Sequence, residues 1–219
     1  MNQHPAITIS RSLGSGGTEA GFLVARRLGW TFCNRRILRL AAEAAGHTSA
    51  GLALQEERHC GFMEQILNIL GYGSPEACYT PLLELPMYSK DLYHTQREVI
   101  LKLVAHAPSV IVGRGGFCAL KGRPDTLHVS IHADLDFRIQ YLVRRGKAPD
   151  PDAARKAIAV SDRDRAAFIR AISGLDWRDP RNFDLVLHVT QEGLDAVPER
   201  IVAEASQRFG LALAHPARV

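Results

Sequence analysis

Residues 6–18 carry the feature that most restricts the fold of this chain. A β-branched run, Ala6-Ile7-Thr8-Ile9, leads into the glycine-rich turn SRSLGSGG and then into apolar residues at helical spacing. This order predicts a strand, a glycine loop and a helix that ends at Gly29. Backbone N–H groups and the positive end of the helix dipole meet at such a loop, which favours anion binding. An ordinary tight turn explains the glycines alone equally well.

The turn contains the candidate phosphate-binding residues. Glycine lets the backbone close around phosphate oxygens without interference from a side chain. Thr18, at the start of the helix, is predicted to place its hydroxyl on a Mg²⁺ ion held by the nucleotide. The candidates are Gly14, Ser15, Gly16, Gly17 and Thr18.

Two phosphate-binding motifs fit this turn incompletely. The dinucleotide pattern GxGxxG has Glu19 in place of its third glycine, and residues 33–35 lack the expected acid. The Walker A pattern GxxxxGK[ST], laid over residues 11–18, has Arg11 for its first glycine and Gly17 for its lysine. The missing lysine requires another cation, and Arg11 is the nearest candidate.

Composition narrows the class of protein. The 219 residues, 46% of them hydrophobic, suffice for a full core, and we expect one domain spanning residues 1–219. The chain has 27 basic and 23 acidic residues, a net charge of +4 carried mostly by arginine. This charge suits a phosphorylated ligand, because arginine grips phosphate oxygens with a planar fork. The arginines are dispersed rather than clustered with aromatic residues, so we expect no nucleic-acid partner.

The spacing of the four cysteines and the length of the apolar runs indicate the cellular compartment of the protein. The cysteines form no CxxC pair, and four in a chain of this length do not make a disulfide framework. No signal-peptide pattern is present, and no apolar run approaches the ~20 residues needed to span a bilayer. We therefore expect a cytoplasmic protein without a membrane partner.

Further strands and helices alternate along the chain, which favours an α/β fold with a parallel sheet. The remaining strands are predicted at residues 31–33, 109–112, 127–131 and 185–189, and helices at 35–45, 88–107, 134–145, 153–172 and 194–209, with Asp134 as a helix cap. Residues 48–87 lack a clear period and are predicted to be a helical insertion that contacts substrate.

Four arginines are candidates for phosphate contacts from their positions alone. Arg138 and Arg145 are seven residues apart on one predicted helix face, for which a solvated face is the more economical explanation. Arg114 follows a buried strand at the edge where α/β sheets bind ligands, and its flanking glycines are predicted to leave room for a nucleotide. Arg35 is a candidate to grip a monophosphate.

Several ordered segments resemble the cytidylate kinase-like proteins, a divergent branch of the P-loop nucleoside monophosphate kinases. The segments cover nearly the whole chain except residues 48–87. They are ITISRSLGSGGTEAGFLVARRLGWTFCNRRIL, VIVGRGG, LHVSIHADLDFRIQYLVRR, SDRDRAAFIRAISGLDW and NFDLVLHV. In typical cytidylate kinases the second segment reads GRD, and Gly115 here replaces that acid.

The resemblance implies a P-loop kinase core with a five-stranded parallel sheet, a substrate-binding region after the first helix and a lid over about residues 146–175. It also implies transfer of a phosphoryl group from ATP, with Mg²⁺, to CMP or dCMP. Arg11, Arg138, Arg163 and Arg165 would be the catalytic arginines, with Asp162 and Asp164 orienting the lid pair, Arg163 and Arg165, by ion pairing. A nucleotide-binding sensor that lost catalysis with the lysine is the alternative.

Overall fold

The computed structural model describes residues 4–34 and 90–211. Within them, five strands form one parallel sheet in the order β2-β3-β1-β4-β5. The central strand β1 pairs on both sides and its first four residues are buried, which suits the β-branched run found there. The predicted parallel sheet is therefore confirmed. The strands are β1 (Ala6–Arg11), β2 (Thr31–Cys33), β3 (Ser109–Val112), β4 (Thr126–His132) and β5 (Leu185–His188).

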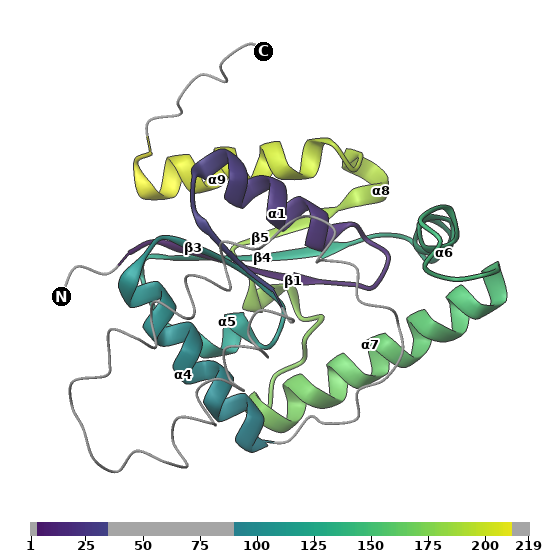
Figure 1. Ribbon diagram of the computed structural model, residues 1–219, viewed down its shortest axis with the longest axis horizontal. Helices are drawn as coiled ribbons and strands as arrows, with labels where there is room; N and C mark the ends of the chain where they lie inside the picture. The colour runs from purple at the N-terminus through teal and green to yellow at the C-terminus, as the bar shows by residue number, and fades with distance from the viewer. Residues whose placement is uncertain (1–3, 35–89, 212–219) are drawn as a thin grey trace.

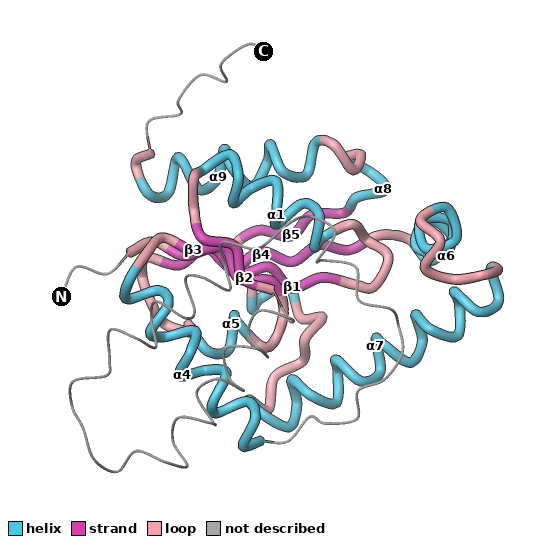
Figure 2. The backbone as a smooth tube through the Cα atoms, in the orientation of Figure 1, coloured by secondary structure: helices cyan, strands magenta, loops and turns pink. Residues whose placement is uncertain are grey.

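Helices cover both faces of the sheet (Figures 1 and 2). The helices on one face are α1 (Gly17–Leu28), α8 (Val189–Glu192) and α9 (Ala196–Phe209). Those on the other are α4 (Lys90–His106), α5 (Gly116–Ala119) and α7 (Pro151–Ser173). Helix α6 (Leu135–Arg144) lies beyond the carboxyl ends of the strands, and a 3₁₀ helix, η3 (Pro180–Asn182), precedes β5.

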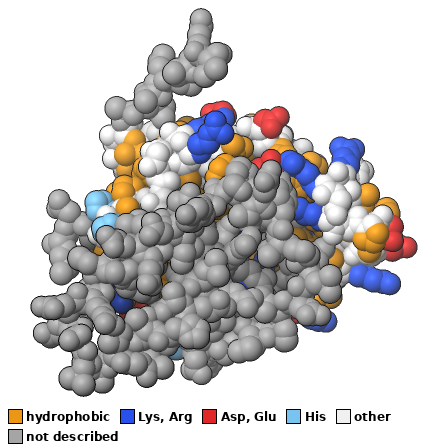
Figure 3. All heavy atoms as spheres, viewed as in Figure 1, with side chains coloured by type: hydrophobic (Ala, Val, Ile, Leu, Met, Phe, Trp, Pro, Cys, Tyr) orange, Lys and Arg blue, Asp and Glu red, His pale blue; other side chains and the backbone are white. Residues whose placement is uncertain are grey.

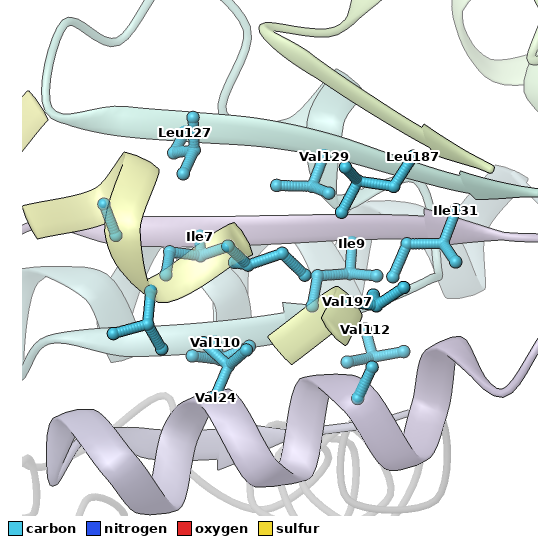
Figure 4. Packing of buried hydrophobic residues seen from close by; sticks show 14 of the residues in the cluster. Ile7, Ile9, Val24, Val110, Val112, Leu127, Val129, Ile131, Leu187 and Val197 are labelled. Carbon is cyan, nitrogen blue, oxygen red and sulfur yellow. The ribbon is translucent and has the colours of Figure 1, made fainter. Parts of the chain in front are cut away.

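The largest hydrophobic cluster lies between the sheet and the helices α1 and α9 (Figure 4). Ile7 and Ile9 of β1 lie at its centre and are fully or almost fully buried. Val24 of α1 and Val197 of α9 close the cluster from the helix side. Burying a side chain of this kind contributes about 1.5–3 kcal/mol. The cluster therefore fixes β1 and α1, the two elements that hold the glycine loop between them.

Helices α7 and α6 both begin after an aspartate, but only one of the two carboxylates caps its helix. Asp150 caps α7 as its carboxylate accepts the N–H of Ala153 at 2.7 Å, and Pro151 makes the helix begin two residues earlier than predicted. Asp134 occupies the N-cap position of α6, but its carboxylate accepts no capping hydrogen bond. It faces His188 Nε2 at 3.5 Å instead, so the predicted cap position is confirmed but the side chain does not cap the helix.

The predicted helix at residues 35–45 and the predicted insertion at 48–87 lie outside the described residues. Among the residues that are described, no helix combines the length and apolar character needed to cross a bilayer. On the face drawn in Figure 3, the visible lysine and arginine side chains are scattered over its upper and right-hand parts.

Candidate active site at the carboxyl edge of the sheet

The glycine loop, residues 12–16, joins the end of β1 to the start of α1. Gly14 and Gly16 have φ of +82° and +72°, a conformation that favours glycine. A Cβ on Gly14 would lie 2.7 Å from the carbonyl oxygen of Arg138, so the loop also packs directly against α6. Ser15 closes the turn, because both its N–H and its hydroxyl donate to the carbonyl of Ser12, at 3.3 and 2.9 Å.

Arg11 occupies the space where a Walker A lysine would begin. A Cβ added to Gly17 would lie only 2.6 Å from the Cβ of Arg11. Real Cβ atoms do not approach so closely, so residues 11 and 17 cannot both carry side chains in this backbone. In the Walker A pattern the first glycine and the lysine stand at these two positions. This chain has the reverse arrangement, with the cation on the strand and the glycine on the helix.

The side chain of Arg11 runs across the carboxyl edge of the sheet. Its Nε donates to the hydroxyl of Thr18 at 3.4 Å, in the first turn of α1. Its guanidinium lies against Gly113, just after β3, where an added Cβ would collide with it. Arg11 therefore connects the glycine loop with the turn that follows the neighbouring strand.

That second turn, Gly113-Arg114-Gly115, has three consecutive positive φ values of +82°, +53° and +65°. Arg114 is the one non-glycine residue with positive φ among those described, a conformation that costs about 1–2 kcal/mol. Its side chain is buried and lines a cavity. The flanking glycines Gly113 and Gly115 line the same cavity, and room for a nucleotide beside them stays a prediction. The Arg11 guanidinium fills the space beside Gly113, and Ile172 and Tyr93 lie beside Gly115.

The cavity lies between the carboxyl ends of β1 and β3 and helix α7. Three cationic side chains line it, one from β1, one from the turn after β3 and one from α7, together with aromatic rings. Such a lining suits an anion attached to an apolar or aromatic body. The cationic residues are Arg11, Arg114 and Arg165, and the aromatic ones are Phe117, Phe168 and Trp177.

Asp162, on α7 near the cavity, is the shared counter-ion of three arginines. Arg138 donates to both of its oxygens, at 2.9 and 2.8 Å. Arg178 donates at 3.0 Å to Oδ2, and Arg165 lies 3.7 Å from Oδ1. One carboxylate thus faces three guanidinium groups, which leaves this region strongly positive.

Arg138 is bound inside the protein. It is only 6% exposed, and its Nε donates to the carbonyl of Leu13 in the glycine loop at 2.6 Å. The sequence favours a solvent-exposed side chain for Arg138, and this prediction is wrong. Arg145, the C-cap residue of the same helix, is partly exposed and pairs with Glu19 at 2.8 Å. Through Arg138, the glycine loop is connected to Asp162 and hence to α7.

Arg163 and Arg165 do not lie together. Two residues along a helix are about 200° apart. Arg165 lines the cavity, whereas the side chain of Arg163 is 75% exposed and lies 3.4 Å from Asp164. The structure therefore brings Arg11, Arg114 and Arg165 together, and Arg163 stands apart. Arg35 lies outside the described residues.

The acidic residues near the loop are engaged by other groups. Glu19 accepts the Tyr141 hydroxyl at 2.8 Å as well as Arg145. Within the described part of the chain, no group of three or more His, Cys, Asp or Glu residues is arranged to hold a metal. The Thr18 hydroxyl, as a hard oxygen at the start of α1, is the side-chain atom that suits Mg²⁺ beside a bound phosphate.

Sequence reasoning missed His132 and Arg178. His132 ends β4, and its Nδ1 lies 3.2 Å from the hydroxyl of Ser12 while its Nε2 lies 2.8 Å from that of Ser130. Burial lowers the pKa of His132, and the nearby charge of Arg178 lowers it further. The position of His132 at the carboxyl end of a buried strand was a usable signal.

A sequence model of the cytidylate kinase-like family matches residues 6–191. A search of curated protein sequences finds no match. The fold is similar to the crystal structure of an uncharacterized protein from Eubacterium ventriosum ATCC 27560, with a TM-score of 0.67 and 18% identity over 93% of this chain and 99% of that one. Shikimate kinase from Acinetobacter baumannii, in complex with shikimate, gives a TM-score of 0.49 and 13% identity over 93% and 94%.

Proposed function

The chain belongs to the cytidylate kinase-like family, and from this premise we propose that it transfers the γ-phosphoryl group of ATP to a nucleoside monophosphate, with CMP or dCMP as the acceptor. One observation carries the proposal. Arg11, Arg114 and Arg165 converge on one cavity beside the glycine loop. Phosphoryl transfer requires little covalent chemistry from a protein, and depends on positioning and on neutralising phosphate charge.

The reaction is balanced without another reactant. An oxygen of the acceptor monophosphate forms a bond to the γ-phosphorus as the bond to the β,γ-bridging oxygen breaks. The products are ADP and a nucleoside diphosphate. The acceptor phosphate is already ionised near neutral pH, since the second pKa of a phosphate monoester is about 6. A general base is therefore not needed, and the positive side chains carry the catalysis.

On the donor side, residues 14–18 hold the ATP phosphates by their backbone N–H groups, and Arg11 replaces the Walker A lysine. The contact between Arg11 and Thr18 supports this, because it keeps the guanidinium at the start of α1. Thr18 would hold Mg²⁺ through its hydroxyl. The chemistry that Mg²⁺ would supply there is neutralisation of charge on the ATP phosphates.

On the acceptor side, Arg114 from the turn after β3 and Arg165 from α7 would hold the monophosphate, since both line the cavity. Arg138 acts as a positioning residue, because its guanidinium already binds Leu13 and Asp162. Arg163 would contribute if α7 moves on closure of the lid, and Arg35 if its segment reaches the cavity. The assignment of Arg163 rests on the family resemblance, and that of Arg35 on its position in the sequence.

A panel of nucleoside monophosphates tests the proposed function. With Mg-ATP and each acceptor in turn, ADP release is expected to depend on the acceptor and to be fastest with CMP or dCMP. The absence of acceptor-dependent ADP with every monophosphate would refute the proposed function. Calorimetric binding of ATP together with that absence would favour the alternative, a nucleotide-binding sensor, for which Gly17 in place of the lysine is the supporting feature.

Gly113→Ala is expected to lower turnover by displacing Arg11. Gly122→Ala is the matched control, since Gly122 has a similar φ of +79° and no atom within 4 Å of an added Cβ. Both variants should lower the free energy of unfolding by about 1–2 kcal/mol because of the positive φ. Only Gly113→Ala should also lower kcat, by about tenfold or more. Equal kcat values for the two variants, measured by ADP release, would contradict the placement of Arg11.

A further inference from the structure

Arg178 lies in the segment between α7 and η3, and its backbone is firmly held. Its N–H donates to Asp176 Oδ1 at 3.0 Å. The amide of Asn182 donates to the carbonyl of Asp176 at 2.7 Å. The preceding residue, Trp177, is almost completely buried and lines the cavity. These contacts thus fix the backbone of Arg178, from which its side chain extends, beside the wall of the cavity.

The side chain of Arg178 is held much less firmly than its backbone. It is 59% exposed, and its Nη2 donates to Asp162 Oδ2 at 3.0 Å. Its guanidinium carbon lies 5.2 Å from the centre of the Trp177 ring, a cation–π contact. Arg138, by contrast, binds the same carboxylate through two nitrogens and is buried. An incoming anion can therefore take Arg178 from Asp162 and leave the Arg138 pair in place.

Two further contacts place Arg178 between the glycine loop and the cavity. The other oxygen of Asp162 faces Arg165, which lines the cavity. The Trp177 ring on which Arg178 lies has its centre 6.3 Å from that of the His132 imidazole, and His132 Nδ1 lies 3.2 Å from the hydroxyl of Ser12 in the loop. The guanidinium therefore lies on the boundary between the donor phosphates and the acceptor as we have assigned them.

We propose that Arg178 is a catalytic arginine that leaves Asp162 and binds the phosphoryl group as it passes from donor to acceptor. The proposal rests on the proposed function, since it assumes a phosphoryl group moving between the loop and the cavity. A guanidinium placed here neutralises charge that is shared by both nucleotides in the transition state. The stack on Trp177 limits the directions in which the side chain can move. Asp162 holds the guanidinium before substrate binds.

Arg178→Ala is compared with Arg181→Ala, a matched control three residues further on. The side chain of Arg181 is 87% exposed and pairs with Asp179, so its removal deletes the same charge from the neighbouring helix η3. With Mg-ATP and the best acceptor, Arg178→Ala should lower kcat by about tenfold to a hundredfold and change the KM values little. Arg181→Ala should stay within about twofold of the wild type. Equal kcat values for the two variants would overturn the proposal.

A second variant distinguishes a loss of phosphoryl-group binding by Arg178 from a loss of protein stability. Arg178→Lys keeps the charge but loses the planar fork. If Arg178→Ala lowers the melting temperature, a reduced kcat of Arg178→Lys at an unchanged melting temperature supports the proposal, and a wild-type kcat contradicts it.

If the proposed function is wrong, the wild-type protein will release no ADP in an acceptor-dependent way. The test of Arg178 then uses inorganic tripolyphosphate, whose Kd is measured by calorimetry. Arg178→Ala should weaken this binding about tenfold relative to Arg181→Ala, since one charged hydrogen bond is lost. Equal Kd values would overturn the role of Arg178 independently of turnover.

Discussion

Arg11→Ala is expected to lower kcat by about 10²–10³-fold, the usual effect of removing one charged donor from a transition state. Arg11 is the side chain that replaces the Walker A lysine, and it reaches from Thr18 to the turn after β3. The measurement is ADP release at saturating Mg-ATP and acceptor. Because alanine keeps the Cβ at the end of β1, the melting temperature should change little.

Arg26→Ala is the control for this experiment. Arg26 is exposed in the last turn of α1, at the opposite end of the helix from the glycine loop, so its loss removes the same charge from a remote position. Its kcat should match that of the wild type. A wild-type kcat for Arg11→Ala would remove Arg11 from the mechanism.

The mutual exclusion of side chains at positions 11 and 17 permits a rescue. The double variant Arg11→Gly, Gly17→Lys restores a complete Walker A pattern over residues 11–18. Gly17 does not have a positive φ, so the helix accepts a lysine there once the Cβ of residue 11 is gone. The double variant should recover part of the kcat lost in Arg11→Ala, whereas Gly17→Lys alone should lower the melting temperature.

Local patterns in the sequence suffice for the sheet and for the glycine loop. The β-branched runs at residues 6–9 and 109–112 are short, apolar and bounded by turns, and both are buried strands in the structure. Gly29 was predicted to end the first helix, and it is the C-cap of α1 with φ of +66°. These features depend on neighbours within a few residues, which a sequence displays directly.

The arrangement of the arginines depends on contacts between distant residues. Arg138 and Asp162 are 24 residues apart and come from two helices, so their spacing gives no sign of the buried pair. Arg178 reaches the same carboxylate from a third segment. Likewise, only the folded backbone shows that positions 11 and 17 are too close for both to carry a side chain. Sequence reasoning identified charged residues, but it could not tell which guanidinium is buried and which one faces the cavity.

Asp162→Ala is expected to lower the free energy of unfolding by about 3–5 kcal/mol, the usual cost of leaving one partner of a buried ion pair alone. Arg138 would lose both hydrogen bonds to the carboxylate while its side chain stays buried. Arg165 and Arg178 would repel it, because Asp162 is also their counter-ion. The measurement is the midpoint of urea unfolding at constant slope.

Asp164→Ala, two residues along α7, is the control for Asp162→Ala. Asp164 is partly exposed and pairs with the exposed Arg163, so the variant should cost less than about 1 kcal/mol. Equal costs for the two variants would show that the Asp162 carboxylate does not stabilise the fold.

The double variant Arg138→Met, Asp162→Leu should regain much of the stability, because buried ion pairs can be replaced by apolar side chains. It should not regain turnover, since Arg165 and Arg178 would still lack the carboxylate that positions them, and the Leu13 carbonyl would lose the hydrogen bond that ties the glycine loop to this cluster.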